Sequence, residues 1–450
     1  IDAKGWLHTG DVGSMDNEGF VKITDRMKDI IITAGGKNIT PSEIENQLKA
    51  SPYISDAVVI GDKRAYLTCL VMIERETVEI YLRHRVRRVS ASAFMQLTPP
   101  LVHYAFSGVH TDAAGRVVRP NHVFAKISRP ETAAHFLSPP PEPLLRALLE
   151  SGALSESEVA LARTLPVAED VTVEADSGGH TDNQTLTAVF PTILAQRDAL
   201  VAKHGYTRPI RVGAAGGLGT PAGVAAAFAL GAAYVVIGSV NQSCVETDLS
   251  KDAKALLAQC RIGDTVMAPC ADMFELGVKV QVLRRGTMFS VHAERLYALY
   301  RAHDGLESLD AATRAQLQDR IFRADLEDIW QRTRAFFSER NPEEVRRAER
   351  DPKHRMALVF RWYLGLSSQW PITGDSDRRV DYQIWCGPAM GAFNAWVAGS
   401  FLEPLEARSA EQVARNLLEG AACITRAQQL RSAGVAVPRR AFEFRPRPLG

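Results

Sequence analysis

Three β-branched runs that each end in a glycine-containing turn constrain the fold of this chain more than any other feature. A β-branched run is typical of a buried strand, and glycine lets main-chain N–H groups approach an anion without a Cβ in the way. An Ala-rich helical stretch separates the second run from the third, which is the arrangement of consecutive βα units in a parallel barrel. The three runs are residues 171–180, 210–217 and 234–239.

The pattern around these runs predicts an α/β fold with a partial TIM-type (β/α) barrel that lacks its first strands. Helical stretches between successive runs imply a parallel sheet with right-handed crossovers. Residues 277–289 are expected to add one more strand or helix to the barrel region. The five expected strands are residues 86–90, 122–127, 171–175, 210–214 and 234–238.

A long connection between the second and third strands predicts an insertion over residues 129–168, because an ordinary βα loop is far shorter. Residues 141–151 and 155–165 have the pattern of a helical hairpin. The second helix begins with a capping box formed by Ser155 and Glu158. Such an insertion would overhang the mouth of the barrel as a lid or as a docking surface.

The choice of basic residue changes sharply along the chain. Residues 1–80 contain six Lys and three Arg, whereas residues 81–450 contain six Lys and thirty-eight Arg. Folding does not require such a change, so we expect two segments of different origin joined near Glu79. The predicted domains are a small α+β N-terminal fragment (1–79), an incomplete barrel (80–289), a helical C-terminal subdomain (290–436) and a disordered tail (437–450).

The first segment resembles the C-terminal lid of the acyl-CoA synthetases, an AMP-binding family, and in particular the long-chain fatty-acid ligases. The runs GWLHTGD at residues 5–11 and VKITDRMKDIII at residues 21–32 carry the resemblance. It implies that Asp11 and Arg26 bind the ribose hydroxyls of an adenylate. A helix is predicted over residues 41–50. The family's adenylation lysine lies in a motif that this segment does not reach, so we expect no ligase activity.

The remainder of the chain, over residues 80–436, resembles the PfaD family, the trans-acting enoyl reductases of polyunsaturated fatty acid and polyketide synthases. That family is itself similar to the FMN-dependent nitronate monooxygenases. The motifs that carry the resemblance are ASAFM (91–95), EADSGGHTDN (174–183), GAAGGLGT (213–220), GSVNQ (238–242) and DYQIWCGPAMGAF (381–393).

This second resemblance implies an FMN cofactor, NADPH or NADH as the electron donor, and an acyl carrier protein as the partner. His180 is the expected catalytic acid, because reduction of an enoyl thioester needs a proton at the α-carbon and imidazole can deliver it near neutral pH. Asp176 and Asp182 are expected to order the loop around it. The residues expected to bind the flavin or its phosphate are Gly178, Gly179, Gly216, Gly217, Gly238 and Ser239.

Two other functional interpretations stay open. One is a nitronate monooxygenase-type flavin oxidase, which the same fold would serve. The other is a non-catalytic chimera of two truncated domains, because five strands are fewer than a barrel needs and would leave unpaired edges. For the same reason we expect this chain alone to bind FMN weakly or not at all. The sequence also begins with Ile1 rather than Met, so we expect its start to differ from a native one.

Several patterns exclude other classes of protein. The formal net charge of +1 gives no reason to expect a nucleic-acid partner. The uncharged run 218–245 is interrupted by Pro221 and Gly231, so we expect a buried α/β unit and not a membrane span. Six scattered Cys residues indicate neither a metal site nor a disulfide framework, and they favour a reducing, cytoplasmic location.

The region beyond residue 290 has helical periodicity and is rich in tryptophan between residues 360 and 400. Two interpretations of these tryptophans remain. They form the core of a helical subdomain, or they line a site for the acyl chain or the carrier protein. The tryptophans are Trp362, Trp370, Trp385 and Trp396.

Overall fold

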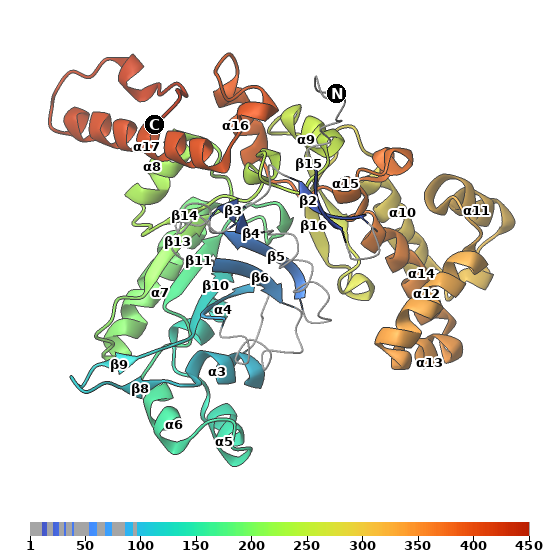
Figure 1. Ribbon diagram of the computed structural model, residues 1–450, viewed down its shortest axis with the longest axis horizontal. Helices are drawn as coiled ribbons and strands as arrows, with labels where there is room; N and C mark the ends of the chain where they lie inside the picture. The colour runs from blue at the N-terminus through green and yellow to red at the C-terminus, as the bar shows by residue number, and fades with distance from the viewer. Residues whose placement is uncertain are drawn as a thin grey trace. The chain divides into compact units, whose positions relative to one another are not determined.

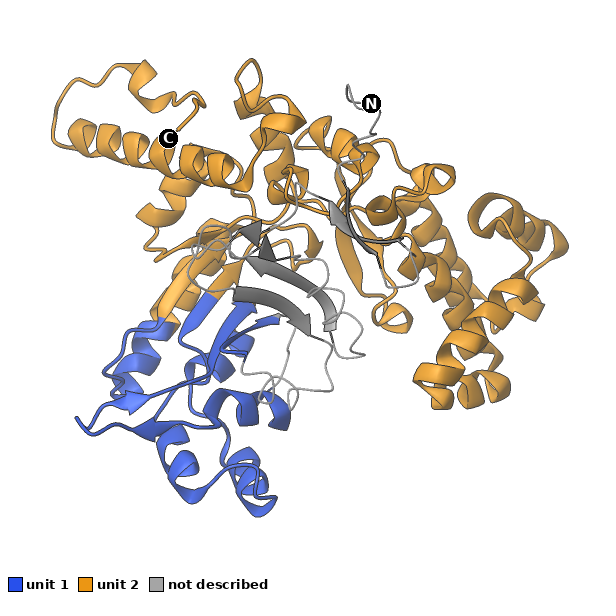
Figure 2. Ribbon diagram, in the orientation of Figure 1, with its two compact units in different colours: residues 1–126, 131–171, 197–210 blue, residues 127–130, 172–196, 211–450 orange. Residues whose placement is uncertain are grey.

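A computed structural model describes residues 86–92 and 97–449, and within the first 85 residues only six strands. The chain divides into two compact units, which Figure 2 shows in different colours. Unit 1 consists of residues 1–126, 131–171 and 197–210, and unit 2 consists of residues 127–130, 172–196 and 211–450.

The strands of the N-terminal segment form antiparallel pairs, as expected for its α+β pattern. β1 (Asp11–Met15) pairs with β2 (Val21–Arg26), β3 (Ile31–Ile32) with β4 (Asn38–Ile39), and β5 (Ile54–Ile60) with β6 (Thr68–Ile73). The register of the first pair places Asp11 opposite Arg26. The helix predicted over residues 41–50 lies outside the described residues.

The main sheet has the five strands that the sequence predicts, in the order β14-β13-β11-β10-β7. The pairs β7–β10 and β13–β14 are parallel. β14 is shorter than predicted, because the chain leaves the sheet after Val236 and enters the 3-10 helix η2 (Asn241–Ser243). The described strands leave this sheet open at both edges, which confirms a partial barrel. The strands are β7 (Arg88–Ser92), β10 (His122–Ile127), β11 (Asp170–Glu174), β13 (Arg211–Ala215) and β14 (Val235–Val236).

Helices connect the strands in the manner of βα units. α7 (Leu186–His204) precedes β13, and α8 (Pro221–Ala229) lies between β13 and β14. The first four residues of β11 are buried, as expected for a strand covered on both faces. The run 218–245 therefore forms a helix and a short strand, and no helix among the described residues is long and apolar enough to cross a membrane.

The insertion in unit 1 contains the predicted helical hairpin. α4 (Pro130–Leu137) leads into α5 (Glu142–Glu150) and α6 (Glu156–Ala162). The capping box is present, since the Glu158 N–H donates to the Ser155 hydroxyl at 3.3 Å and the Ser155 N–H donates to the Glu158 carboxylate at 2.7 Å.

A second sheet, which the sequence pattern did not reveal, lies in unit 2. It is antiparallel and has the order β12-β16-β15. β16 (Lys279–Leu283) is the element expected within residues 277–289, but it joins this sheet and not the main sheet. The other strands are β12 (Gly179–His180) and β15 (Thr265–Pro269). β12 is too short for period-two alternation to be visible in the sequence.

The region beyond residue 289 is helical, as predicted. α12 (Leu326–Arg340), α13 (Pro342–Arg350) and α14 (Pro352–Leu366) pack against one another (Figure 1). Trp370 is buried, Trp362 and Trp396 pack partly against the core, and Trp385 is exposed over 36% of its surface. Three of the four tryptophans thus belong to the core, and the fourth does not.

The C-terminal tail, for which the sequence predicts disorder, makes side-chain contacts with the last long helix. Side-chain amides of α17 (Ala410–Ser432) bind its last residues, since Asn416 donates to the Arg447 carbonyl at 3.0 Å and Gln412 donates to the Leu449 carbonyl at 2.6 Å. The Trp396 indole N–H donates to the Phe444 carbonyl at 2.8 Å. These side-chain contacts leave no periodic pattern in the sequence.

We predict that Ser155→Ala lowers the free energy of unfolding by about 1 kcal/mol, because α6 loses its N-cap acceptor. Urea denaturation followed by circular dichroism measures the change. Ser157→Ala, on the same helix, is the matched control: the Ser157 hydroxyl contacts that of Ser155 at 3.1 Å but accepts no main-chain N–H of α6, so its loss is expected to change stability much less. Equal effects of the two substitutions would contradict the capping role.

Candidate functional site

The turns that follow β11 and β13 meet at the carboxyl ends of the two strands in unit 2. The Ala175 N–H donates to the Ala215 carbonyl at 2.8 Å. A β-carbon on Gly216 would lie 2.7 Å from the carbonyl carbon of Ala175, and Gly216 has a φ of +86°. Only glycine fits such a close approach with a positive φ. Two of the three sequence motifs are therefore in contact.

A segment distant in sequence joins the third motif to the first. We call residues 381–387 the strap. Within the strap, a β-carbon on Gly387 would lie 2.8 Å from the Gly178 nitrogen, and one on Gly178 would lie 2.8 Å from the Cys386 nitrogen. Gly179 has a φ of +81°, and a β-carbon on it would lie 2.6 Å from an atom of the Trp385 ring. Packing inside the protein thus explains why both residues are glycine.

The turn after β14 holds the same end of the strap. The Gly387 N–H donates to the Ser239 hydroxyl at 2.9 Å, and the Gln242 side chain donates to the Trp385 carbonyl at 2.6 Å. In its middle the strap extends the second sheet, since the Cys386 N–H donates to the Gln281 carbonyl at 3.2 Å. The strap therefore contacts both the turn after β11 and the turn after β14. The turn after β13 contacts the turn after β11 directly.

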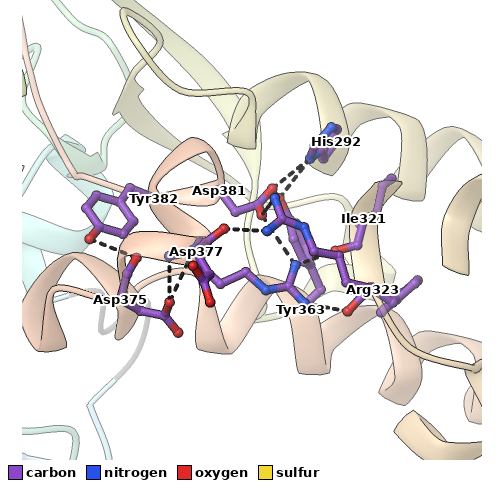
Figure 3. Close-up of polar contacts among 10 residues, drawn as sticks. His292, Ile321, Arg323, Tyr363, Asp375, Asp377, Asp381 and Tyr382 are labelled. Atoms are coloured by element: carbon purple, nitrogen blue, oxygen red, sulfur yellow. Dashed lines mark hydrogen bonds and ion pairs between the residues drawn. The ribbon is translucent and has the colours of Figure 1, made fainter. Parts of the chain in front are cut away.

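The beginning of the strap is fixed by Asp381, whose buried carboxylate accepts hydrogen bonds from four side chains (Figure 3). The Nδ1 of His292 and the hydroxyl of Tyr363 lie 3.0 Å from one carboxylate oxygen. Guanidinium nitrogens of Arg323 and Arg378 each lie 3.3 Å from the other. Burial alone would raise the pKa of Asp381, but the hydrogen bonds from His292 and Tyr363 hold that pKa below its ordinary value of 3.8.

Three main-chain N–H groups at the strand ends have no acceptor within the described part of the chain: those of Gly217, Gly238 and Ser239. A β-carbon on Gly217 or Gly238 would meet no atom within 4 Å, so the space around both glycines is open. The N-terminus of α8 begins just after this turn, and its partial positive charge favours an anion. These residues fit a phosphate group such as that of FMN.

His180 lies on β12, beside the strap. Its Nε2 is 3.8 Å from the Cys270 sulfur and 3.9 Å from a carboxylate oxygen of Asp272. Its ring meets that of Trp385 edge to face, with centroids 5.4 Å apart. Burial raises the pKa of Cys270 to about 12, so that thiol stays neutral near pH 7. The imidazole side chain is 29% exposed.

Two nearby carboxylates have the structural roles that the sequence predicts. Asp182 accepts hydrogen bonds from Arg129 at 2.6 and 2.8 Å and from the Ser128 hydroxyl. Asp176 accepts from the Gln281 side chain at 2.6 Å. Gln281 was not expected from the sequence, because a lone Gln in a strand carries no functional signal. The side chains of Asp11 and Arg26 lie outside the described part of the chain.

Comparison with known proteins places the larger part of the chain in a family. The fold and the turns define an α/β protein with a parallel sheet and a candidate anion site at its carboxyl edge. The enoyl reductase domain of MlnA, from the macrolactin biosynthesis cluster of Bacillus amyloliquefaciens, is 36% identical with a TM-score of 0.74, and the match covers 79% of each chain. The chain belongs to the family of that enoyl reductase domain, which confirms the PfaD-type resemblance.

Two relatives extend this result. Polyketide biosynthesis protein PksE of Bacillus subtilis is 44% identical over 345 residues, which are 77% of this chain and 45% of PksE. A polyunsaturated fatty acid synthase protein of Thraustochytrium sp. is 44% identical over 367 residues, which are 80% of this chain and 24% of that protein. The chain thus spans less than half the length of either relative.

Two family models match shorter parts. Residues 28–114 match the AMP-binding enzyme C-terminal domain, which confirms the N-terminal resemblance and reaches beyond the compositional step near Glu79. Residues 303–382 match the inserted helical domain of [acyl-carrier-protein] S-malonyltransferase. That match ends where the strap begins.

We predict that Asp381→Asn lowers the free energy of unfolding at pH 7 by about 2 kcal/mol, because Arg323 and Arg378, which are themselves partly exposed, lose the charged acceptor of their hydrogen bonds. The folded-state pKa of Asp381 is depressed, so its contribution is present above 3.8 and is lost as the pH falls through the folded-state value. The difference in unfolding free energy between the variant and the wild type, measured by urea titration, should therefore shrink as the pH falls below 3.8.

Asp377→Asn is the matched control for this prediction. Asp377 lies in the same 3-10 helix, and only its main-chain carbonyl contacts Arg323. Its substitution is expected to change stability by less than about 0.5 kcal/mol. A destabilisation by Asp381→Asn that stays constant down to acid pH would contradict the role of the charge.

Proposed function

We propose that this chain is a flavin-dependent enoyl reductase that acts in trans on thioesters carried by an acyl carrier protein, in polyketide or polyunsaturated fatty acid biosynthesis. One observation carries the proposal. The main-chain N–H groups of Gly217, Gly238 and Ser239 lack an acceptor among the described residues and lie at strand ends, and the N-terminus of α8 follows the turn at Gly217, which suits a flavin phosphate. The family of the chain supports the same activity.

In this proposal the chain positions the reactants and supplies the proton. FMN, when bound, provides the hydride chemistry, with NADPH or NADH as the electron source. The turn at Gly178 and Gly179 is held rigid by the strap, so that His180 keeps a fixed place relative to the phosphate-binding turns. His180 donates a proton to the α-carbon of the enoyl thioester. The Trp385 ring restricts access of water to one side of the imidazole.

A second candidate is a non-catalytic chimera, which the open edges of the main sheet and the compositional step near Glu79 favour. A barrel with unpaired edges would hold a flavin poorly. We therefore predict that the purified chain carries flavin far below stoichiometric amounts, as measured by flavin absorbance after extensive dialysis. Near-stoichiometric flavin would contradict the chimera and would favour a complete site.

We predict that His180→Gln lowers reduction of an enoyl thioester on an acyl carrier protein by about a hundredfold or more, in the presence of added FMN and NADPH or NADH. Flavin affinity should not change. His303→Gln, whose ring contacts the Ser308 hydroxyl away from the site, is the matched control and should keep full activity. Turnover of a nitroalkane with oxygen, and none of the thioester, would contradict the proposed reaction.

A further inference from the structure

Apolar side chains are exposed in a loop whose first residues contact His180 and which the proposed mechanism does not use. Cys270 and Asp272, both in contact with His180, begin a loop that ends at Gly277. Within this loop the side chains of Met273 and Leu276 are 47% and 77% exposed. We propose that this Met273 loop (residues 270–277) is the wall that receives the acyl chain of the thioester substrate, an inference that rests on the proposed function.

The Met273 loop is fixed in place by Phe274. That ring is fully buried and lies against Tyr297, Tyr300 and Phe360, with centroid distances of 5.5, 5.2 and 6.4 Å. At the end of the loop a β-carbon on Gly277 would lie 2.2 Å from the Tyr297 hydroxyl. Because Phe274 occupies the core position, the neighbouring apolar side chains are held at the surface.

The backbone of the loop carries strain at the same place. Met273 has a φ of +50° and a ψ of +38°, a left-handed conformation that residues with a β-carbon rarely adopt. Strained non-glycine residues persist where the surrounding structure imposes them, and they concentrate at ligand-binding sites. Met273 therefore combines a strained backbone with an exposed, unbranched side chain that can adapt its shape to a bound alkyl chain.

The charges around His180 favour an alkyl chain over a phosphate-bearing group. Cys270 is neutral, and the Asp272 carboxylate close to the imidazole would repel an anion. The guanidinium of Arg361, near this loop, lies 3.6 Å from Glu275 and is neutralised by it. The exposed Trp385 ring adds apolar surface beside His180. An apolar chain attached near the reacting carbons meets these requirements.

The test measures binding of dodecenoyl and crotonyl pantetheine thioesters to the full chain by isothermal titration calorimetry, without flavin or nicotinamide. The wild type should bind the longer thioester at least about tenfold more tightly, because its extra methylenes are buried. The double substitution Met273→Ser with Leu276→Ser should lower the ratio of dodecenoyl to crotonyl affinity by about tenfold and leave the crotonyl affinity unchanged. Both substitutions replace exposed side chains, and thermal unfolding checks that the variant folds.

Val291→Ser is the matched control, since Val291 is 55% exposed on α10 (Phe289–Ala302) and its substitution should leave both affinities unchanged. A double variant that keeps the chain-length preference overturns the inference, as does a wild type that binds both thioesters equally or binds neither. If the chain-length preference depends on Met273 and Leu276 but the protein has no reductase activity, the inference is supported and the proposed function is wrong. If the protein has reductase activity but the double variant keeps the chain-length preference, the proposed function is supported and the inference is wrong.

Discussion

The contact between Gly178 and Gly387 is the constraint on which the site depends. A β-carbon on either glycine would overlap the backbone of the other segment, so two segments about 200 residues apart can meet only if both positions are glycine. This contact, with the bond from the Gly387 N–H to Ser239, brings the turns after β11 and β14 together. The open N–H groups at the strand ends follow from that arrangement.

The helical region contributes by fixing the strap. Asp381 lies where the helical match ends and the strap begins, and its buried carboxylate binds partners from α10, α14 and the turn at Arg323 (Figure 3). A charged group in that position is stable only with all of its partners present. The geometry of the glycine turns is therefore coupled to the packing of helices that touch neither the turns nor His180.

The sequence predicted the main sheet well because its short apolar strands alternate with helical stretches and three of them lead into glycine-containing turns, and it predicted the insertion because a capping box has a fixed spacing. The glycines of the site were found because three turns followed three strands. The strap was recognised only as part of the motif at residues 381–393, and neither Asp381 nor Gln281 was assigned a structural role, because their partners are distant in sequence. The tail was expected to be disordered, because Arg and Pro dominate it and the amides of Gln412 and Asn416 act from another element.

Titration of FMN into the chain labelled with nitrogen-15 glycine tests the central claim most directly, because amide shifts report weak binding residue by residue. The account predicts that Gly217 and Gly238 shift together with one apparent affinity, while Gly178 and Gly387, which face each other, shift much less. Independent affinities at Gly217 and Gly238, or shifts at only one of them, would contradict a single site formed by the gathered turns.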